Sequence, residues 1–174
     1  MGRNRPAEQV KNLDEIPLPA YHLIDVTQYF QNIEEWFNIY AKSLGGHRLV
    51  NDLRKKVGNR KYFIPFISGR GCTHRCLFCY RHVHGIRKHS VDYVITHMKY
   101  LIENYGVEGF QFCDELFNAT PEWVLQFCDA IEENNLEIFY RVSGARVDRI
   151  NEKILLRLRE TGCIDCEYGQ ETGS

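Results

Sequence analysis

The chain has 174 residues, of which 44% are hydrophobic and 26% are charged, and its formal net charge is −1. This composition is ordinary for a folded globular domain, and the near-neutral charge creates no field that would attract nucleic acid or an anionic membrane. The polar amino-terminal residues do not resemble a signal peptide, and we find no apolar run long enough to span a bilayer. We therefore expect neither nucleic acid nor a membrane as a partner.

The cysteines indicate a metal site. The chain contains seven of them, an odd number, and three fall within the eight residues 72–79. Without an export signal, this usage argues against a disulfide framework and favours metal ligation in a reducing compartment. We therefore predict a cytoplasmic location.

A linker and one helix are expected in residues 1–59. The first 20 residues are polar and contain three prolines, which is typical of a linker. From Thr27, apolar residues recur at helical spacing until Gly45-Gly46 interrupts the pattern. Residues 47–60 are basic and mixed in pattern, and they support no assignment.

Predicted strands and helices alternate in residues 60–174. The expected strands are 62–67, 109–113, 137–141 and 164–168, and the expected helices are 90–105, 120–133 and 151–161. Ser90 is a cap and Gly106 a stop for the first of these helices, and Thr120-Pro121 is a typical helix start. Connections of this length suit parallel crossovers, so we predict an α/β fold, a partial TIM-like barrel of about four parallel strands.

Four strand–helix steps are roughly half of an eight-unit barrel, which needs about 250 residues. The last predicted strand lies directly before Ser174 and would leave an open sheet edge. We therefore expect a fragment of a longer protein, or a chain that needs the remaining half-barrel or a partner chain. Alone, such a piece is expected to be poorly stable or to associate.

The strongest chemical signal is a CxxxCxxC pattern formed by Cys72, Cys76 and Cys79 after the first predicted strand. Thiolates are the preferred ligands of iron–sulfur clusters, and three in one short loop can reach three corners of a cubic cluster. No fourth cysteine follows at close spacing. One iron would stay open for a substrate, just as catalytic zinc sites keep an open position.

This pattern resembles the signature of the radical S-adenosylmethionine (SAM) superfamily, in which an aromatic residue, here Phe78, precedes the last cysteine. The likeness is closest to the subfamily that pairs a cobalamin-binding domain with a radical SAM barrel. It extends from about residue 60 to the end of the chain. Short stretches that resemble motifs of that subfamily are 12–17, 87–90, 112–117, 145–148 and 169–174.

The resemblance implies a mechanism. A 4Fe–4S cluster on the three cysteines would bind SAM, cleave it reductively and release a 5′-deoxyadenosyl radical that abstracts hydrogen from a substrate. The electron would come from a donor of the flavodoxin or ferredoxin type. The residues that the resemblance places at SAM are Phe78 and the backbone near Tyr80 beside adenine, Asp114 and Glu115 near the methionine amino end or ribose, and Arg146 and Glu171 at the remaining polar groups.

The sequence departs from the superfamily at two points. The glycine-glycine-glutamate that is common after the second strand is replaced by Cys113-Asp114-Glu115, which leaves open which carboxylate contacts SAM. Residues 1–174 also contain no Asp-x-His-x-x-Gly motif, so cobalamin is expected only if a separate domain exists. The substrate and the reaction subtype are left open.

Two other functions are compatible with the cysteine triplet. One is a structural zinc-binding interaction module, with His74, His82 or His84 as the fourth ligand. The other is a ferredoxin-like electron carrier with an intact four-cysteine cluster. Among the remaining cysteines, Cys113 and Cys128 are expected in the core, and the Cys163-x-x-Cys166 pair is expected to be small residues at the start of a buried strand.

Overall fold

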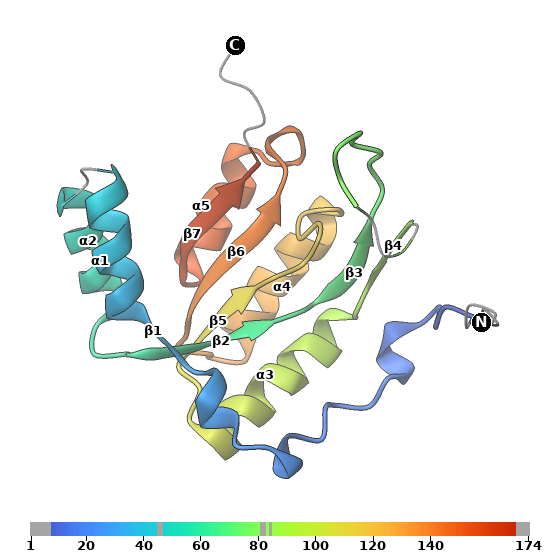
Figure 1. The fold of residues 1–174 in the computed structure, drawn as a ribbon, viewed down its shortest axis with the longest axis horizontal. Helices are drawn as coiled ribbons and strands as arrows, with labels where there is room; N and C mark the ends of the chain where they lie inside the picture. Colours follow the sequence, from blue (N-terminus) through green and yellow to red (C-terminus); the bar gives the residue numbers. More distant parts are fainter. Residues whose placement is uncertain (1–7, 45–46, 81–82, 84, 170–174) are drawn as a thin grey trace, which may run out of the picture.

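The protein is built around one sheet, seen in the computed structural model, which describes residues 8–44, 47–80, 83 and 85–169 (Figure 1). Its strand order is β1-β2-β5-β6-β7. Strands β2, β5, β6 and β7 run parallel to their neighbours, and β1 pairs antiparallel with β2. The bounds are β1 Gln31–Asn32, β2 Tyr62–Phe66, β5 Gly109–Phe112, β6 Phe139–Ala145 and β7 Cys163–Tyr168.

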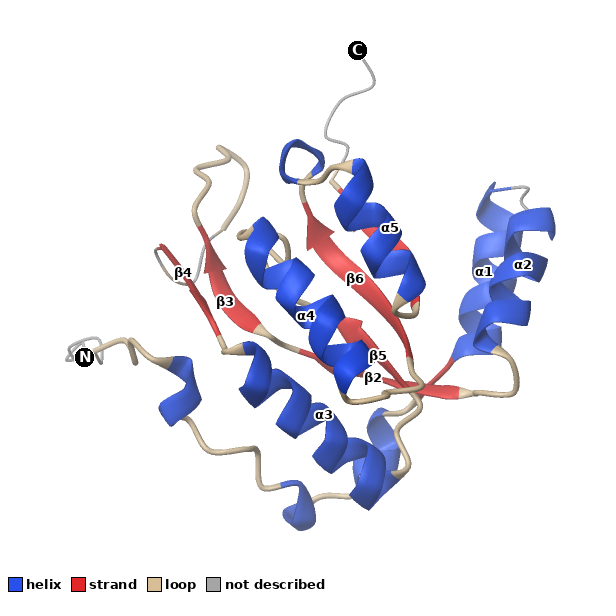
Figure 2. Ribbon diagram, turned by 180° about the vertical axis from the view of Figure 1, so that it is seen from behind, coloured by secondary structure: helices blue, strands red, loops and turns tan. Residues whose placement is uncertain are grey.

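Three helices connect the parallel strands and cover one face of the sheet (Figure 2). They are α3 Val91–Tyr105, α4 Pro121–Glu133 and α5 Glu152–Glu160. The repeated strand–helix step confirms the predicted α/β fold, a partial barrel with its helices outside. No helix within the described ranges is long and apolar enough to cross a membrane.

The helix boundaries follow local capping chemistry. The Ser90 hydroxyl accepts a hydrogen bond from the backbone N–H of Tyr93 at 3.1 Å, which begins α3. Gly106 ends the same helix with a φ of 66°, a left-handed conformation that glycine adopts without a steric penalty. Helix α4 begins with Pro121 in its first turn, although the Thr120 side chain makes no capping bond. These predicted boundaries are confirmed.

Strand β6 lies later in the chain than predicted, at 139–145 instead of 137–141. The chain turns after α4, where Asn135 takes a φ of 50° and Leu136 donates its N–H to the Ile131 carbonyl at 3.0 Å. At its other end, β6 continues past Gly144, whose φ is 75°, through a register shift against β7. The positive φ at residue 144 favours glycine, and the alternation of side chains along the strand does not predict the register shift.

Aromatic side chains fill the core between the sheet and helices α3 to α5. Phe112 is fully buried, and its ring contacts four other aromatic rings at centroid distances of 5.1 to 5.9 Å. These rings belong to Phe66, Phe117, Phe127 and Tyr140. These rings pack against residues of α3, α4 and α5, so they lie on the helix-covered outer face of the partial barrel. The side chains that alternate with them along each strand face the opposite side of the sheet.

Helices α1 (Ile33–Leu44) and α2 (His47–Val57) pack on the opposite face of the sheet. Their buried residues Ile33, Phe37, Val50 and Val57 form one cluster with Phe63, Phe139 and Ile164 of the sheet. Gly109 makes room there, since a Cβ at that position would lie 2.5 Å from the Phe139 ring. Helix α2 lies in the segment that the sequence left unassigned.

The amino-terminal segment is more ordered than the predicted linker. It forms three short 3-10 helices, Leu13–Glu15, Tyr21–Leu23 and Val26–Tyr29, and its Leu13 is 1% exposed. The predicted helix start at Thr27 is wrong, because the Asp25 carboxylate accepts the Thr27 N–H at 3.1 Å and closes a 3-10 turn there. The Asn32 side chain then accepts the Glu34 N–H at 2.9 Å, in the first turn of α1.

A buried histidine couples this segment to α3 and predicts a pH dependence. His97 lies against the Phe66 ring, its Nε2 is 2.8 Å from the Tyr21 hydroxyl, and burial lowers its pKa to about 4. Between that value and about pH 6.5, the unfolded chain binds the extra proton and the folded chain does not. The free energy of unfolding should therefore fall as the pH decreases through this window, by roughly 3 kcal/mol at most.

Urea unfolding at several pH values checks this expectation. His97→Gln should flatten the dependence, since a neutral amide cannot take up the proton. The exposed His22 supplies the control variant His22→Gln, which should keep the slope of the parent. Equal slopes in the parent and His97→Gln would rule out this origin of the pH dependence.

Candidate functional site

The cysteine segment belongs to a β-hairpin that the sequence did not predict. Strands β3 (Gly69–Cys72) and β4 (Gly85–Lys88) pair antiparallel, with Gly69 opposite Lys88 and Cys72 opposite Gly85. Gly71 permits the close pairing, since a Cβ there would lie 2.2 Å from the Gly85 carbonyl oxygen. Figure 1 shows the loop after β3 at the same end of the sheet as the loop after β6 and the carboxyl end of β7.

The three thiols lie at the tip of this hairpin. Cys72 is half-buried at the end of β3, and Cys76 and Cys79 are exposed. The Cys72 sulfur accepts the backbone N–H of His74 at 3.4 Å, and the Cys79 N–H donates to the Cys76 carbonyl at 3.2 Å. A backbone N–H donated to a cysteine sulfur, as His74 donates to Cys72, stabilises negative charge on that sulfur.

The donor chemistry of these residues fits an iron–sulfur cluster. All three cysteines are free thiols on one short loop, so no disulfide has to be broken before they bind iron. Within the described ranges, no three His, Cys, Asp or Glu side chains already stand together as a metal site.

Two aromatic residues of the same loop are exposed. The exposed fraction is 71% for Phe78 and 82% for Tyr80. Neither side chain belongs to the core, so both can contact a ligand that lies over the loop.

Asp114 and Glu115, which follow β5, have different environments. The Asp114 carboxylate is buried and accepts hydrogen bonds from the backbone N–H groups of Ser68 and Gly69, at 2.7 and 3.2 Å. It also pairs with the Lys88 ammonium at 2.7 Å. Glu115 is exposed and accepts only a longer bond from the Gly71 N–H, at 3.3 Å, among the contacts of the described residues. Of the two carboxylates, Glu115 is the one accessible to a ligand.

Arg146 follows β6 and lies near the cysteine loop. Its guanidinium donates two hydrogen bonds of 2.9 Å to Asp148, and its backbone N–H donates to the Asn118 side chain at 2.9 Å. The pKa of Arg146 is raised, chiefly by the bond to Asp148 and further by the sulfurs of Cys76 and Cys72. The structure thus brings a cation to the loop that carries the thiols.

Three of the residues considered in the sequence lie outside the described residues. These are Glu171, the proposed polar contact after β7, and His82 and His84, the alternative zinc ligands. His74 is described, and its Nδ1 lies 3.9 Å from the Cys72 sulfur.

An ionic network on the inner face of the sheet was missed. Arg141 of β6 is 4% exposed and pairs with Asp165 and Glu167 of β7, at 3.0 and 2.6 Å. Its guanidinium stacks on the Trp36 ring of α1 at 4.1 Å, and Ser143 donates to Glu167 at 3.0 Å. The signal was available, because polar residues alternate along both strands and therefore share one face.

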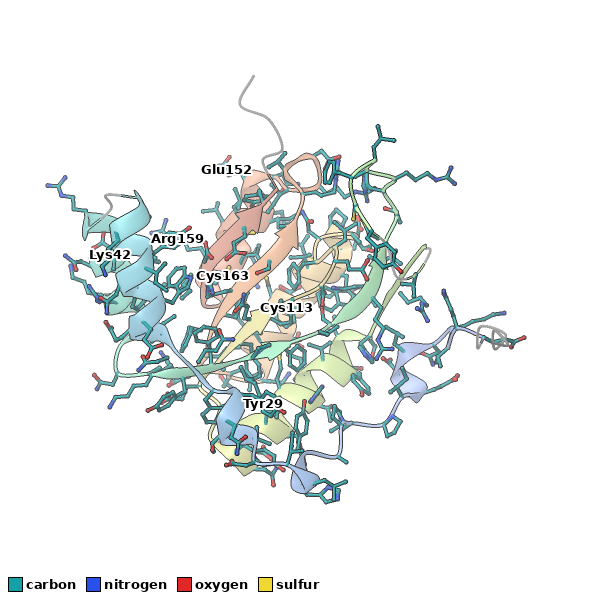
Figure 3. The ribbon with its side chains drawn as sticks, in the orientation of Figure 1. Tyr29, Lys42, Cys113, Glu152, Arg159 and Cys163 are labelled. Carbon is teal, nitrogen blue, oxygen red and sulfur yellow. The ribbon has the colours of Figure 1, made fainter. Side chains whose placement is uncertain are left out.

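The other cysteines divide between core and surface. Cys128 is fully buried, as predicted, whereas Cys113 is exposed at the end of β5, so its predicted core position is wrong (Figure 3). Cys113 directly follows the last residue of β5, where the chain leaves the sheet. Cys163 and Cys166 are half-buried in β7, and burial raises the pKa of both thiols.

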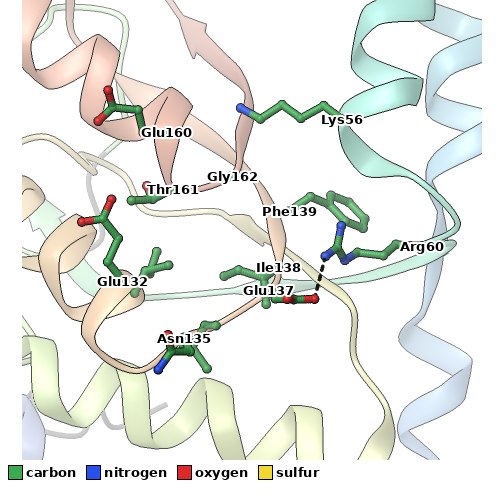
Figure 4. Close-up of a pocket in the computed structure, with 12 residues that line it drawn as sticks. Lys56, Arg60, Glu132, Asn135, Glu137, Ile138, Phe139, Glu160, Thr161 and Gly162 are labelled. Carbon is green, nitrogen blue, oxygen red and sulfur yellow. Dashed lines mark ion pairs between the residues drawn. The ribbon is translucent and has the colours of Figure 1, made fainter.

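A separate pocket lies at the opposite end of the sheet, where the chain enters β6 and β7 (Figure 4). Lys56 donates to the Cys163 carbonyl at 2.9 Å beside this pocket, and Arg60 pairs with Glu137 at 3.8 Å. Parallel barrels place their reactive groups at the carboxyl ends of the strands, so the cysteine end is the candidate active site.

Comparison with known proteins points to the same segment. The family model of the Radical SAM superfamily matches residues 66–174. An uncharacterized methyltransferase of Pyrococcus horikoshii is 27% identical over 179 residues, which cover 99% of this chain and 32% of the relative. Cytidylyl-2-hydroxyethylphosphonate methyltransferase of Streptomyces wedmorensis is 26% identical over 164 residues, which cover 92% of this chain and 27% of that protein.

A solved structure shares the fold. The cobalamin-dependent S-adenosylmethionine radical enzyme OxsB matches with a TM-score of 0.55 and 19% identity, over 65% of this chain and 19% of that one. The chain spans less than a third of the length of the curated relatives that it matches.

Proposed function

The chain belongs to the Radical SAM superfamily, a superfamily of enzymes, and from this membership we propose that it is the cluster-bearing part of one. In this proposal Cys72, Cys76 and Cys79 bind a 4Fe–4S cluster, and one iron stays open for SAM. The observation that carries the proposal is the position of three free thiols at the carboxyl end of the parallel strands, with Cys72 at the end of β3 and Cys76 and Cys79 in the loop that follows (Figure 1). When bound, the cluster would supply the one electron needed to cleave SAM to methionine and a 5′-deoxyadenosyl radical, which would take hydrogen from the substrate.

The chain's own residues bind and orient SAM in this proposal. Glu115 is the carboxylate that receives the positively charged amino group of the methionine part, because Asp114 is already engaged in four bonds. Phe78 and Tyr80 lie over the adenine, and their exposure leaves their rings accessible. Arg146 and Glu171 bind the remaining polar groups of SAM.

Residues 60–174 are the proposed catalytic core of this protein, and residues 1–59 are an amino-terminal extension whose helices α1 and α2 pack on the inner face of the sheet. The electron donor is a flavodoxin or ferredoxin, and the substrate is a small molecule. Free thiols in such number suit the reducing cytoplasm.

Methyl transfer is the reaction subtype that we propose for the whole protein. Both curated relatives bear the name methyltransferase, and one is named for a cytidylyl-phosphonate substrate. Cobalamin would take part only through a domain outside residues 1–174, as the cobalamin-dependent structural relative suggests.

Anaerobic reconstitution with iron and sulfide tests the central proposal. We expect about four irons and four sulfides per chain, and a reduced cluster whose electron paramagnetic resonance spectrum changes when SAM is added. Stoichiometric zinc in the aerobically purified protein, with no iron uptake, would favour a structural zinc module. A reduced cluster whose electron paramagnetic resonance spectrum does not change when SAM is added would favour an electron carrier.

A further inference from the structure

The hairpin that carries the cysteines is not hydrogen-bonded to the main sheet as a strand. Strands β3 and β4 form their own two-stranded sheet among the described residues. Its position over the end of the main sheet therefore depends on side chains at its base. There, Gly69 begins β3 and faces Lys88, which ends β4.

Asp114 binds the base of the hairpin from β3's side. Its carboxylate accepts the backbone N–H groups of Ser68 and Gly69 and also the Ser68 hydroxyl. Its side chain is 1% exposed, so these bonds form away from water and tie the first residues of the hairpin to the end of β5. A charged acceptor makes each bond stronger than a neutral one would.

Lys88 completes the connection from β4. Its ammonium is 2.7 Å from the Asp114 carboxylate and 2.7 Å from the Ser68 hydroxyl, and it donates to the Phe117 carbonyl at 3.2 Å. The same ammonium lies 3.9 Å from the centre of the Trp123 ring, a cation–π contact with α4. One carboxylate and one ammonium thus connect both hairpin strands to the body of the protein.

The segment that carries Asp114 is itself held against the loop after β6. A Cβ at Gly144 would lie 2.2 Å from the Asp114 carbonyl oxygen, and the Gly144 carbonyl accepts the Phe117 N–H at 3.1 Å. The Asn118 side chain makes a reciprocal pair of hydrogen bonds with the backbone of Arg146, at 2.8 and 2.9 Å. Asp114 therefore lies between the thiol loop and the loop of Arg146.

We propose that Asp114 and Lys88 are positioning residues that set the hairpin, and through it Cys72, Cys76 and Cys79, relative to the loop of Arg146. The expected effect on SAM binding rests on the proposed function. The attachment of the hairpin by Asp114 and Lys88 does not depend on that function. A buried ion pair of this kind contributes little net stability, because removing both charges together is often neutral or stabilising. Its effect is on geometry.

Three variants separate positioning from stability. Asp114→Asn keeps the shape but loses the charge, Lys88→Met removes the cation, and the double variant leaves no unpaired buried charge. Controls are Lys55→Met, which breaks the exposed ion pair with Asp52, and Asp129→Asn, which breaks an ion pair with Arg157; neither pair belongs to the hairpin. Hydrogen exchange of the 66–72 segment is measured in the protein without added metal, and SAM affinity in the anaerobically reconstituted protein.

We expect the double variant to remain as stable to urea as the parent. Its 66–72 amides should nevertheless exchange about tenfold faster, because Ser68 and Gly69 lose a charged acceptor. In the reconstituted double variant, SAM should bind at least about tenfold more weakly at unchanged iron content. The single variants should show the same changes with lower stability, and the controls should show neither.

The inference would be overturned if the double variant matched the parent in both the hydrogen exchange of the 66–72 segment and the affinity for SAM. If the parent takes up no iron, the proposed function fails, and the exchange experiment still decides whether Asp114 and Lys88 hold the hairpin.

Discussion

Cys76→Ser is expected to abolish cluster uptake and, with it, the formation of 5′-deoxyadenosine from SAM. The Cys76 thiol is exposed and its removal leaves the core untouched, so the fold should persist. A serine hydroxyl is a far poorer iron ligand than a thiolate, and two thiols cannot hold a cluster that needs three. Iron content after anaerobic reconstitution and chromatographic quantification of 5′-deoxyadenosine measure the effect, a fall of about a thousandfold or more in product.

Cys113→Ser is the matched control for this loss. Cys113 is also an exposed thiol, at the end of β5, and is no ligand in the proposed site. This variant should bind as much iron as the parent and respond to SAM. Loss of the cluster in Cys113→Ser would instead indicate a fourth cysteine ligand and a closed site, as in an electron carrier.

Phe112→Ala is expected to destabilise the fold by about 3 to 5 kcal/mol, the cost of deleting a fully buried aromatic side chain. Its ring contacts four others, so the cavity cannot be closed by a single side-chain movement. This is a large part of the stability of a typical domain, roughly 5 to 15 kcal/mol. Urea unfolding followed by far-ultraviolet circular dichroism measures it.

Phe78→Ala provides the comparison, because this side chain is 71% exposed on the cysteine loop. The free energy of unfolding should change by no more than about 0.5 kcal/mol. Under the proposed function, the same variant should weaken SAM binding. A strong destabilisation by Phe78→Ala would show that the ring packs in the fold and is not held ready for a ligand.

The helices after residue 90 could be predicted because their signals are local. Ser90, Gly106 and Pro121 act within one turn of the helix ends that they mark, so the chemistry of neighbouring residues suffices. The amino-terminal region was predicted less well. The side chains of Asp25 and Asn32 accept backbone N–H groups two residues later and close short turns. Because of these turns, α1 begins at Ile33 and not at the predicted Thr27.

The three cysteines of the candidate site are evident in the sequence, whereas their structural surroundings are not. The spacing of Cys72, Cys76 and Cys79 is a property of the chain alone, and the seven residue steps from Cys72 to Cys79 can span at most about 25 Å. The hairpin below them could not be predicted, since its strands are short and rich in glycine, and such strands carry little alternation.

The sequence by itself determined the alternation of the parallel strands with helices α3 to α5 and the grouping of three cysteines within eight residues, because both depend on patterns that a few neighbouring residues contain. Only the tertiary structure decided which carboxylate is free. Asp114 meets Ser68 and Lys88 across 46 and 26 residues of chain, whereas Glu115, one position later, stays exposed. Both residues lie beyond the end of β5, and the residues that each side chain contacts are set by the packing of segments distant in sequence.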